Sequence, residues 1–394
     1  MAERIYMDYA STTPVLPEVI EVMLPYMKEE FGNPQSLHAF GDAPKNAVDG
    51  ARAKVAEMIG AESVEIYFTA TGTESNNMAI KGVAAALQKK GKHLISTEIE
   101  HHSVMHPLKT LEKQGFEITY VPVDRYGLVN PDDVKSAIRQ DTILVSVTHA
   151  SNEIGTIEPI KEIAAITKEK GVFLHTDAIQ TAGIIPVNVK ELGVDFLSLS
   201  AQQFYGPKGV AAIYIRKGAR IMPILDGGIQ ENGRRAGTEN VPGIAGMGKA
   251  CEIAIKEMEK RNQKLCALRD SLIKGLTTKI PHCYLNGHPE KRLPGNANLS
   301  MEYIEGESIL LLLNMNGVAA SSGSACTSRA LKASHVLTAM GIPPEIAQGS
   351  MLFSLGIYNK EEDVAKVCEV LPPIVDRLRQ MSPLYEEAKK EGKI

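Results

Sequence analysis

The chain has 394 residues, of which 44% are hydrophobic and 23% charged, and its formal net charge is −4. These fractions are typical of globular proteins and exclude disordered and fibrous classes, and the lack of a basic stripe argues against nucleic acid as the main partner. The longest apolar run, residues 309–313, is far shorter than a membrane span, and the first ten residues do not resemble a signal peptide, so we expect a soluble, cytoplasmic protein without membrane contact.

Between residues 60 and 215, short runs rich in β-branched residues alternate with helical periodicity, as in residues 77–89 and 160–170. Such alternation predicts an α/β fold in which helices cover a mostly parallel sheet, with ligands bound at the carboxyl ends of the strands. Residues that carry chemistry should therefore follow strands. Seven strands are predicted, at residues 65–70, 93–99, 117–123, 142–148, 172–176, 195–199 and 210–215.

A glycine-rich passage, residues 227–243, separates this region from a different pattern toward the C-terminus. A long helix is predicted from Ile244 to about Lys274. Strands and helices then follow without regular alternation, which predicts a second unit of the α+β type. These elements are two strands at residues 296–301 and 351–355, and two helices at 307–314 and 360–380.

The two patterns predict two domains. We assign residues 14–260 to a large domain, and residues 1–13 together with 261–394 to a smaller α+β domain. The five cysteines have neither the paired spacing of a zinc site nor a disulfide framework. Cys326 lies in a loop of small residues, whereas the other four lie in helix-like or strand-like context and are expected to be buried core thiols: Cys251, Cys266, Cys283 and Cys368.

Two polar segments that follow predicted strands could hold a phosphorylated ring. Gly72 and Thr73 stand where a helix begins, and free backbone N–H groups with hydroxyl side chains form a natural phosphate cradle there. Asp177 ends an apolar strand, where a carboxylate could pair with a protonated ring nitrogen. The residues alone leave the alternative open that both segments are ordinary helix caps.

Two further segments carry imidazole and thiol groups. His101 and His102 follow another strand, where an imidazole could stack on a flat cofactor, and with no third ligand nearby the pair does not indicate zinc. Residues 321–328 are small residues around Cys326, which suits an exposed thiolate on a mobile loop. The alternative is a Ser/Gly linker that happens to contain a cysteine.

Together these segments resemble the NifS/IscS-type cysteine desulfurases, a class V aminotransferase-like family, in the subgroup with a long cysteine loop. The resemblance runs nearly end to end, from MDYASTTP at residues 7–14 to SPLY at residues 382–385. Its most specific motifs are GPKG at 206–209, RAGTEN at 235–240, and the Cys326 loop followed by SHVL at 334–337.

The resemblance implies a fold-type-I architecture that binds pyridoxal 5'-phosphate (PLP) and normally forms a homodimer. By position, Gly72, Thr73 and Ser200 would hold the phosphate of PLP. Thr238 would reach the same phosphate from the second subunit.

For the ring of PLP, the resemblance implies four contacts. His101 would stack on the pyridine, Asp177 would pair with its nitrogen, and Asn152 and Gln180 would contact the side of the phenolic oxygen. Cys326 would carry sulfur as a persulfide.

At four positions the chain departs from the family's motifs. Gln203 occupies the position of the lysine that links to PLP and removes the Cα proton, and Gln202 replaces a histidine. Leu352 stands where the family has the arginine that binds the substrate carboxylate, and Ile357 replaces another arginine. A carboxamide takes up no proton near neutral pH, and Leu makes no charged hydrogen bond. We therefore expect non-covalent PLP and weak or lost desulfurase activity.

The implied function is conversion of L-cysteine to L-alanine, with sulfur carried on Cys326 and passed to an IscU-type scaffold in iron–sulfur cluster assembly. The tail helix before Ser382 would help to dock that scaffold. Two alternatives stay open. One is a non-catalytic partner of the scaffold whose Cys326 accepts sulfur or ligates an iron–sulfur cluster. The other is a different PLP activity, such as that of a lyase or an aminotransferase.

Overall fold

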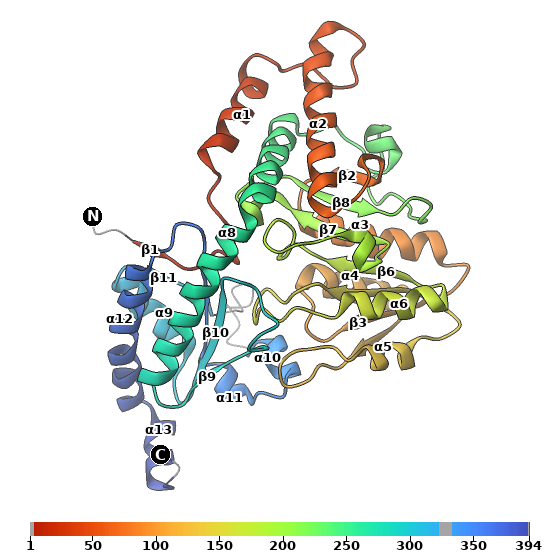
Figure 1. Cartoon of the computed structure of the whole chain (residues 1–394). Coiled ribbons are helices and arrows are strands. Elements are labelled where there is room, and N and C mark those ends of the chain that lie inside the picture. Colours follow the sequence, from red (N-terminus) through yellow and green to blue (C-terminus); the bar gives the residue numbers. More distant parts are fainter. Residues whose placement is uncertain (1–3, 323–332, 393) are drawn as a thin grey trace.

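The computed structural model describes residues 4–322, 333–392 and 394, which form a large and a small unit (Figure 1). The large unit contains a seven-stranded sheet of order β2-β8-β7-β6-β5-β3-β4. All neighbours from β7 to β4 are parallel, whereas β8 is antiparallel to both β2 and β7. The predicted mostly parallel sheet is thus confirmed, with strands β2 (Ile66–Thr69), β3 (His93–Thr97), β4 (Glu117–Val121), β5 (Thr142–Thr148), β6 (Phe173–Asp177), β7 (Phe196–Ser200) and β8 (Ala211–Ile215).

The central strands of this sheet are buried on both faces. Because successive strand residues point to opposite faces, Leu144 and Phe196 pack into one core, whereas Val145 and Leu197 pack into the other. Burial on both sides explains why these strands are nearly continuous apolar runs. The covering helices are α3 (Gly72–Leu87) and α4 (His102–Glu112) on the first face, and α2 (Asp42–Ile59), α6 (Ile160–Lys170) and the start of α8 (Val241–Lys279) on the second.

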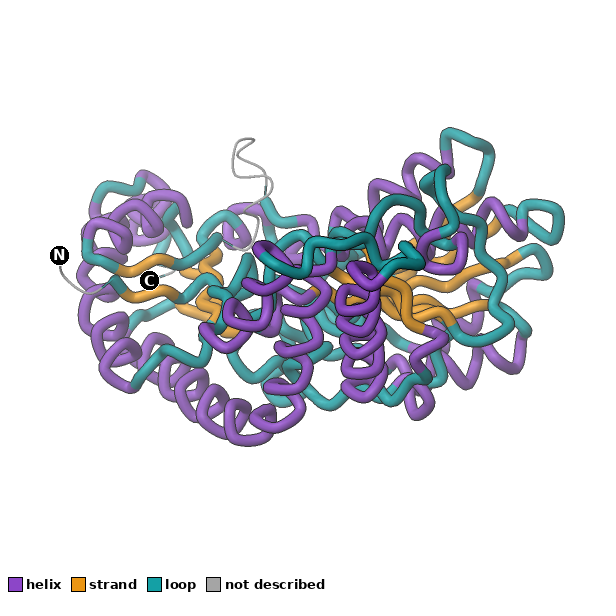
Figure 2. The backbone as a smooth tube through the Cα atoms, turned by 90° about the horizontal axis from the view of Figure 1, so that it is seen from above, coloured by secondary structure: helices purple, strands orange, loops and turns teal. Residues whose placement is uncertain are grey.

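The small unit is a three-stranded antiparallel sheet of order β12-β10-β9, covered by helices. Its core contains Leu272 of α8, whereas Met247 of the same helix lies in a core of the large unit, so α8 joins the two units. Figure 2 shows the strands of the two sheets as separate groups with helices around them. The elements are β9 (Cys283–Leu285), β10 (Asn296–Met301), α9 (Gly306–Met315), β12 (Ser350–Ser354) and α12 (Glu361–Gln380).

The N-terminal segment packs on the small unit, because β1 (Ile5–Tyr6) pairs in parallel with β11 (Val318–Ala319). The predicted division after residue 260 falls inside α8 and stays a prediction. The remaining elements are α1 (Pro17–Lys28), α5 (Pro131–Ala137), α7 (Val189–Leu192), α10 (His335–Ala339), α11 (Pro344–Ala347), α13 (Pro383–Lys390), and short 3₁₀ turns at Ala39–Gly41, Ser63–Glu65, Ala201–Phe204 and Gln230–Gly233.

One predicted boundary is wrong in a way that matters for the site. The helix expected at residues 77–89 begins five residues earlier, at Gly72. The cause is local, because the Thr71 hydroxyl accepts a hydrogen bond from the Glu74 N–H at 3.1 Å and caps the helix. The polar run before Asn77 is therefore the first turn of α3, with its N–H groups directed out of the helix end.

Of the four expected core thiols, Cys251, Cys283 and Cys368 are buried and Cys266 is half-buried. Burial raises the pKa of the Cys251 and Cys283 thiols, which makes them poor nucleophiles. Cys326 lies outside the described residues. Within the described chain, no helix combines the length and the apolar character that crossing a bilayer requires.

Candidate functional site

The carboxyl ends of the parallel strands meet a cavity of about 370 Å³ that the small unit closes from the other side. Segments that follow five strands line it, and Ser321, His335 and Leu352 line it from the small unit. The structure thus brings together residues that are far apart in the sequence. Ten of the predicted site residues are among them: Gly72, Thr73, His101, Asn152, Asp177, Gln180, Ser200, Gln202, Gln203 and Leu352.

Three predicted site residues do not line this cavity. Thr238 lines a small neighbouring pocket, and Ile357 lines another. Cys326 lies outside the described residues. Within the part of the chain that the structure describes, no three His, Cys, Asp or Glu side chains are arranged to hold a metal ion.

The N-terminus of α3 forms one end of the cavity. A Cβ on Gly72 would lie 2.2 Å from Ile179 Cδ1 and 3.6 Å from Ser200 Cβ, so any larger residue would require the Ile179 side chain to move. The first N–H groups of a helix have no partner within the helix, and the helix dipole adds positive potential there. With the hydroxyls of Thr73 and Ser200 nearby, this end fits a phosphate group.

A chain of hydrogen bonds joins three elements whose residues His101, Ser103 and Asp177 line the cavity. The Asn76 amide donates to Asp177 Oδ2 at 2.7 Å and to Ser103 Oγ at 2.8 Å. His101 Nδ1 accepts from the Ser103 N–H at 3.1 Å and lies 2.7 Å from Ser103 Oγ. Because Nδ1 is an acceptor, a neutral His101 carries its proton on Nε2.

Asn76 is not among the cavity's lining residues but supports two of them, and the sequence analysis missed it. It lies one turn after Gly72 on α3 and has no exposed surface. The one signal in the sequence was its spacing from Gly72, since residues four apart lie on the same face of a helix.

The Asp177 carboxyl is suited to a cationic ring nitrogen. Burial raises the pKa of Asp177, and its Oδ1 accepts the Ile179 N–H at 3.0 Å. A cation facing Asp177 would stabilise the ionised carboxylate, and the carboxylate would in turn stabilise the protonated ring nitrogen. Together with the phosphate-sized helix end and His101, the residues present fit a phosphorylated pyridine such as PLP.

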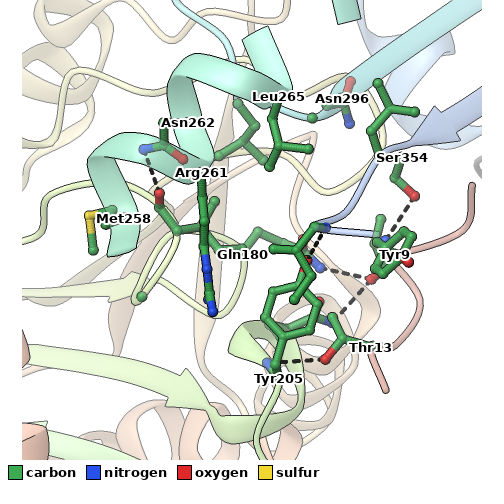
Figure 3. Close-up of a pocket in the computed structure, with 18 residues that line it drawn as sticks. Tyr9, Thr13, Gln180, Tyr205, Met258, Arg261, Asn262, Leu265, Asn296 and Ser354 are labelled. Atoms are coloured by element: carbon green, nitrogen blue, oxygen red, sulfur yellow. Dashed lines mark hydrogen bonds between the residues drawn. The ribbon is translucent and has the colours of Figure 1, made fainter. Parts of the chain in front are cut away.

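Gln203 provides no attachment point for an aldehyde. Its amide donates to the backbone carbonyl of Ala10 at 3.1 Å, and the amide of Gln180 donates to the same oxygen at 3.0 Å. Both glutamines also line a second pocket of about 70 Å³ (Figure 3), as does Ile357. Lys208 supplies no amine to the cavity, because it is not among the lining residues and its Nζ donates to the Thr13 carbonyl at 2.6 Å.

The cavity wall also contains two buried carboxyls that the sequence analysis did not identify as site residues. Glu100 Oε1 accepts from Thr97 Oγ1 at 2.8 Å and from the Thr148 N–H at 2.9 Å, and burial raises the pKa of Glu100 to about 8. Glu153 Oε2 accepts from Ser334 Oγ at 2.5 Å, and burial raises the pKa of Glu153 to about 7. Both groups are therefore largely or partly protonated at neutral pH.

Comparison with known proteins gives consistent results. Residues 5–367 match the aminotransferase class-V family. The chain is 57% identical over 389 residues to a protein named cysteine desulfurase IscS from Dictyoglomus turgidum, covering 99% of both chains. It is 58% identical over 382 residues to one of the same name from Methanosarcina thermophila, covering 97% of this chain and 94% of the other.

Solved structures agree with these relatives. A NifS-like protein superposes with a TM-score of 0.90 at 39% identity, covering 95% of this chain and 100% of the other. A structure titled SspA in complex with cysteine superposes with a TM-score of 0.81 at 33% identity, covering 90% of this chain and 100% of the other.

The buried carboxyls predict how stability depends on pH. A carboxyl whose pKa is raised by folding stabilises the folded protein while it is protonated, and this contribution is lost as the pH rises. For Glu100 the loss begins near the ordinary carboxyl pKa of 4.5 and is complete above the folded-state pKa of about 8. Glu100→Gln stays neutral at every pH, so its thermal unfolding midpoint should match that of the wild type near pH 5 and exceed it above pH 8. Exposed Glu290→Gln, the control, should follow the wild type. Parallel profiles of wild type and Glu100→Gln would contradict this assignment.

Proposed function

The chain belongs to the aminotransferase class-V family with full-length cysteine desulfurase relatives, and from this premise we propose that it is a PLP-binding protein of iron–sulfur cluster assembly. The observation that carries the proposal is the convergence of the α3 N-terminus, Asp177 and His101 on one cavity. Its substrate would be L-cysteine, and Cys326 would carry the sulfur.

The residues of the cavity would divide the binding of PLP among them. The N–H groups of Gly72 and Thr73, with the Ser200 hydroxyl, would hold the phosphate, while Asp177 would pair with the ring nitrogen and His101 would stack on the ring. When bound, PLP supplies a sink for the electrons released at the substrate Cα. Because Gln203 stands at the lysine position, the cofactor would be held without a covalent link.

Intrinsic desulfurase activity should be weak. The amide of Gln203 takes up no proton at neutral pH, and the loss of one general base typically costs about 10²–10⁴-fold in rate. Leu352 offers no hydrogen bond to a substrate carboxylate, whereas each charged hydrogen bond contributes roughly 1.5–3 kcal/mol. The alternative, a non-catalytic partner that accepts sulfur or ligates a cluster through Cys326, follows if no activity remains.

The proposed activity can be tested by measuring the alanine formed from L-cysteine in the presence of PLP and a thiol. The double variant Gln203→Lys/Leu352→Arg restores a base and a carboxylate partner, so it should form alanine about 10²–10⁴-fold faster than the wild type. Gln203→Met/Leu352→Met changes the same positions without basic groups and should stay at the wild-type level. A wild-type rate equal to that of the Lys/Arg variant would show that another group has replaced the lysine.

An apolar surface near Thr238 supports a homodimer. Phe31, Leu37 and Phe40 follow α1 and are 72%, 104% and 62% exposed, and Ile229 is 81% exposed. The Gln35 amide donates to Glu239 Oε1 at 3.3 Å, which holds this segment beside Thr238. Clustered apolar side chains of this kind mark protein interfaces. We infer that a second copy covers them and that Thr238 reaches the partner's phosphate site.

Charged substitutions on this surface should separate the subunits. Leu37→Asp/Phe40→Asp should give a monomeric mass in size-exclusion chromatography with light scattering, because burying carboxylates in an interface is costly. The monomer should also bind PLP more weakly, since Thr238 would be missing from the site. Leu384→Asp, at an exposed apolar position 55% accessible on α13, is the control and should remain dimeric. An unchanged mass for Leu37→Asp/Phe40→Asp would disprove this interface.

The C-terminal tail has features suited to docking a scaffold protein. Met381 and Leu384 are 73% and 55% exposed. Contacts of Tyr385 hold the start of α13 against the small unit. The Tyr385 ring centroid lies 5.7 Å from that of Tyr303 and 5.8 Å from the Arg379 guanidinium. A rigid helix with an exposed apolar pair can dock in a partner's groove. We propose that an IscU-type scaffold binds here.

The docking proposal can be tested with the purified scaffold. Met381→Asp/Leu384→Asp should weaken scaffold binding by at least about 10-fold in calorimetry, because a few apolar anchors carry most of an interface's energy. Met315→Asp, at a 74% exposed apolar position on α9, should bind like the wild type. Equal affinities of all three proteins would exclude the tail as the docking site.

A further inference from the structure

An ion pair supports the end of the cavity that fits a phosphate group. Arg235 Nε donates to Glu74 Oε1 at 2.9 Å, and each of the two side chains is 21% exposed. Glu74 belongs to the first turn of α3, whereas Arg235 follows the 3₁₀ turn at Gln230–Gly233. Neither residue is among those that line the cavity. An effect of this pair on a bound phosphate would therefore act through neighbouring residues or through charge.

Glu74 fixes the backbone turn that leads into α3. Its Oε2 accepts the Ala70 N–H at 2.9 Å, and its own N–H donates to Thr71 Oγ1 at 3.1 Å. These two bonds close the segment from Ala70 to Glu74 into a ring, in the manner of a capping box. Residues 70–73 of this ring line the cavity. The Glu74 side chain thus holds, from outside the cavity, the turn whose N–H groups would face a phosphate.

The negative charge of Glu74 is unfavourable for the ligand that this turn would hold. A phosphate ester carries a charge of about −1.5 to −2 at pH 7. A carboxylate that is hydrogen-bonded to the adjoining backbone repels such a group. The Arg235 guanidinium is in contact with this carboxylate and offsets most of the repulsion. The ion pair therefore keeps the hydrogen bonds of Glu74 while removing its net charge.

The segment that carries Arg235 is anchored on both sides of it. Glu231 has a φ of 47°, a left-handed conformation that a residue other than glycine keeps only when its surroundings hold it there. Its carboxylate accepts two hydrogen bonds from the Arg52 guanidinium, both at 2.7 Å, and one from a backbone N–H of β2 at 2.8 Å. Further along the chain, the Asn240 amide donates to the Gly209 carbonyl at 3.1 Å. These anchors keep the Arg235 guanidinium beside Glu74.

We propose that Arg235 is a positioning residue for the phosphate of PLP: it neutralises Glu74, so that this carboxylate fixes the phosphate-binding turn without repelling the phosphate. The inference rests on the proposed function, because it concerns how this chain holds PLP. It extends the set of residues on which phosphate binding depends to an ion pair outside the cavity lining.

The test compares PLP with pyridoxal, which has the same ring without the phosphate. Calorimetric titration of the full chain freed of PLP gives both dissociation constants, and their ratio isolates the contribution of the phosphate. Arg235→Gln leaves the Glu74 charge uncompensated, so it should weaken PLP binding about 10-fold or more and change pyridoxal binding by less than about 2-fold. Arg216→Gln is the matched control. It removes an arginine from an ion pair with Asp195, at 2.7 Å, and should keep the wild-type ratio.

A second substitution tests the charge itself. Glu74→Gln keeps an oxygen that accepts the Ala70 N–H but carries no charge. The double variant Glu74→Gln/Arg235→Gln removes the repulsion, so its PLP affinity should return to within a few-fold of the wild-type value. Glu74→Gln alone should bind PLP at least as tightly as the wild type, because the positive charge of Arg235 is then uncompensated. A defect caused by loss of structure would not be repaired by a second substitution.

The outcomes separate this inference from the proposed function. A wild-type protein that does not bind PLP would overturn both. If the wild type binds PLP but Arg235→Gln binds it equally well, or loses affinity for PLP and pyridoxal alike, the positioning role is wrong while the proposed function stands. A double variant as weak as Arg235→Gln would also contradict the role, and this comparison decides if pyridoxal binds too weakly to measure. If Arg235→Gln does not fold, Glu74→Gln decides, since weaker PLP binding than in the wild type would overturn the inference.

Discussion

The hydrogen-bond chain from Asp177 through Asn76 and Ser103 to His101 is the interaction on which the candidate site depends. It ties the end of β6 to the first turns of α3 and α4, so the same contacts that pack these helices on the sheet also orient the carboxyl and the imidazole. Each donor in a buried chain needs its acceptor, and losing one leaves an unsatisfied polar group. The geometry of the ring end is therefore fixed by folding itself.

The opposite side of the cavity is lined by neutral side chains that fit the same framework. Gln203 contributes a neutral amide, which donates to the Ala10 carbonyl. Leu352 is buried in a strand of the small unit, where an apolar side chain needs no partner. Because each of these side chains suits its surroundings, neither disturbs the fold around the phosphate end. The side chains at the substrate end can therefore differ without a change in the residues that form the phosphate end.

The two exposed apolar surfaces lie far apart. Figure 1 shows α1, next to the segment with Phe31 and Phe40, and α13, with Leu384, at opposite ends of the molecule. A subunit interface at one end and a scaffold at the other would therefore not compete for space. The cavity lies where the small unit meets the carboxyl ends of the large sheet.

The sequence by itself determined the seven strands, the order of the two units, and the positions of ten residues that meet in the cavity. These follow from local patterns, since a strand's periodicity and a residue's place after it need no distant partner. The expected replacement of a lysine by Gln203 and of an arginine by Leu352 also comes from the sequence alone, through the resemblance of its motifs, and stays a prediction. Even the start of α3 was readable in principle, because Thr71 and Glu74 are close in the chain.

Only the tertiary structure decided the charge of the cavity and which residues are neighbours in space. Glu100 and Glu153 have raised pKa values because elements distant in sequence bury them. Asn298, which pairs with Leu352 across β10 and β12, donates its amide to the Glu153 backbone carbonyl. Asn76 joins Asp177 and Ser103 across 101 and 27 residues of chain. Burial and electrostatic environment are sums over spatial neighbours, so no local pattern could have fixed them.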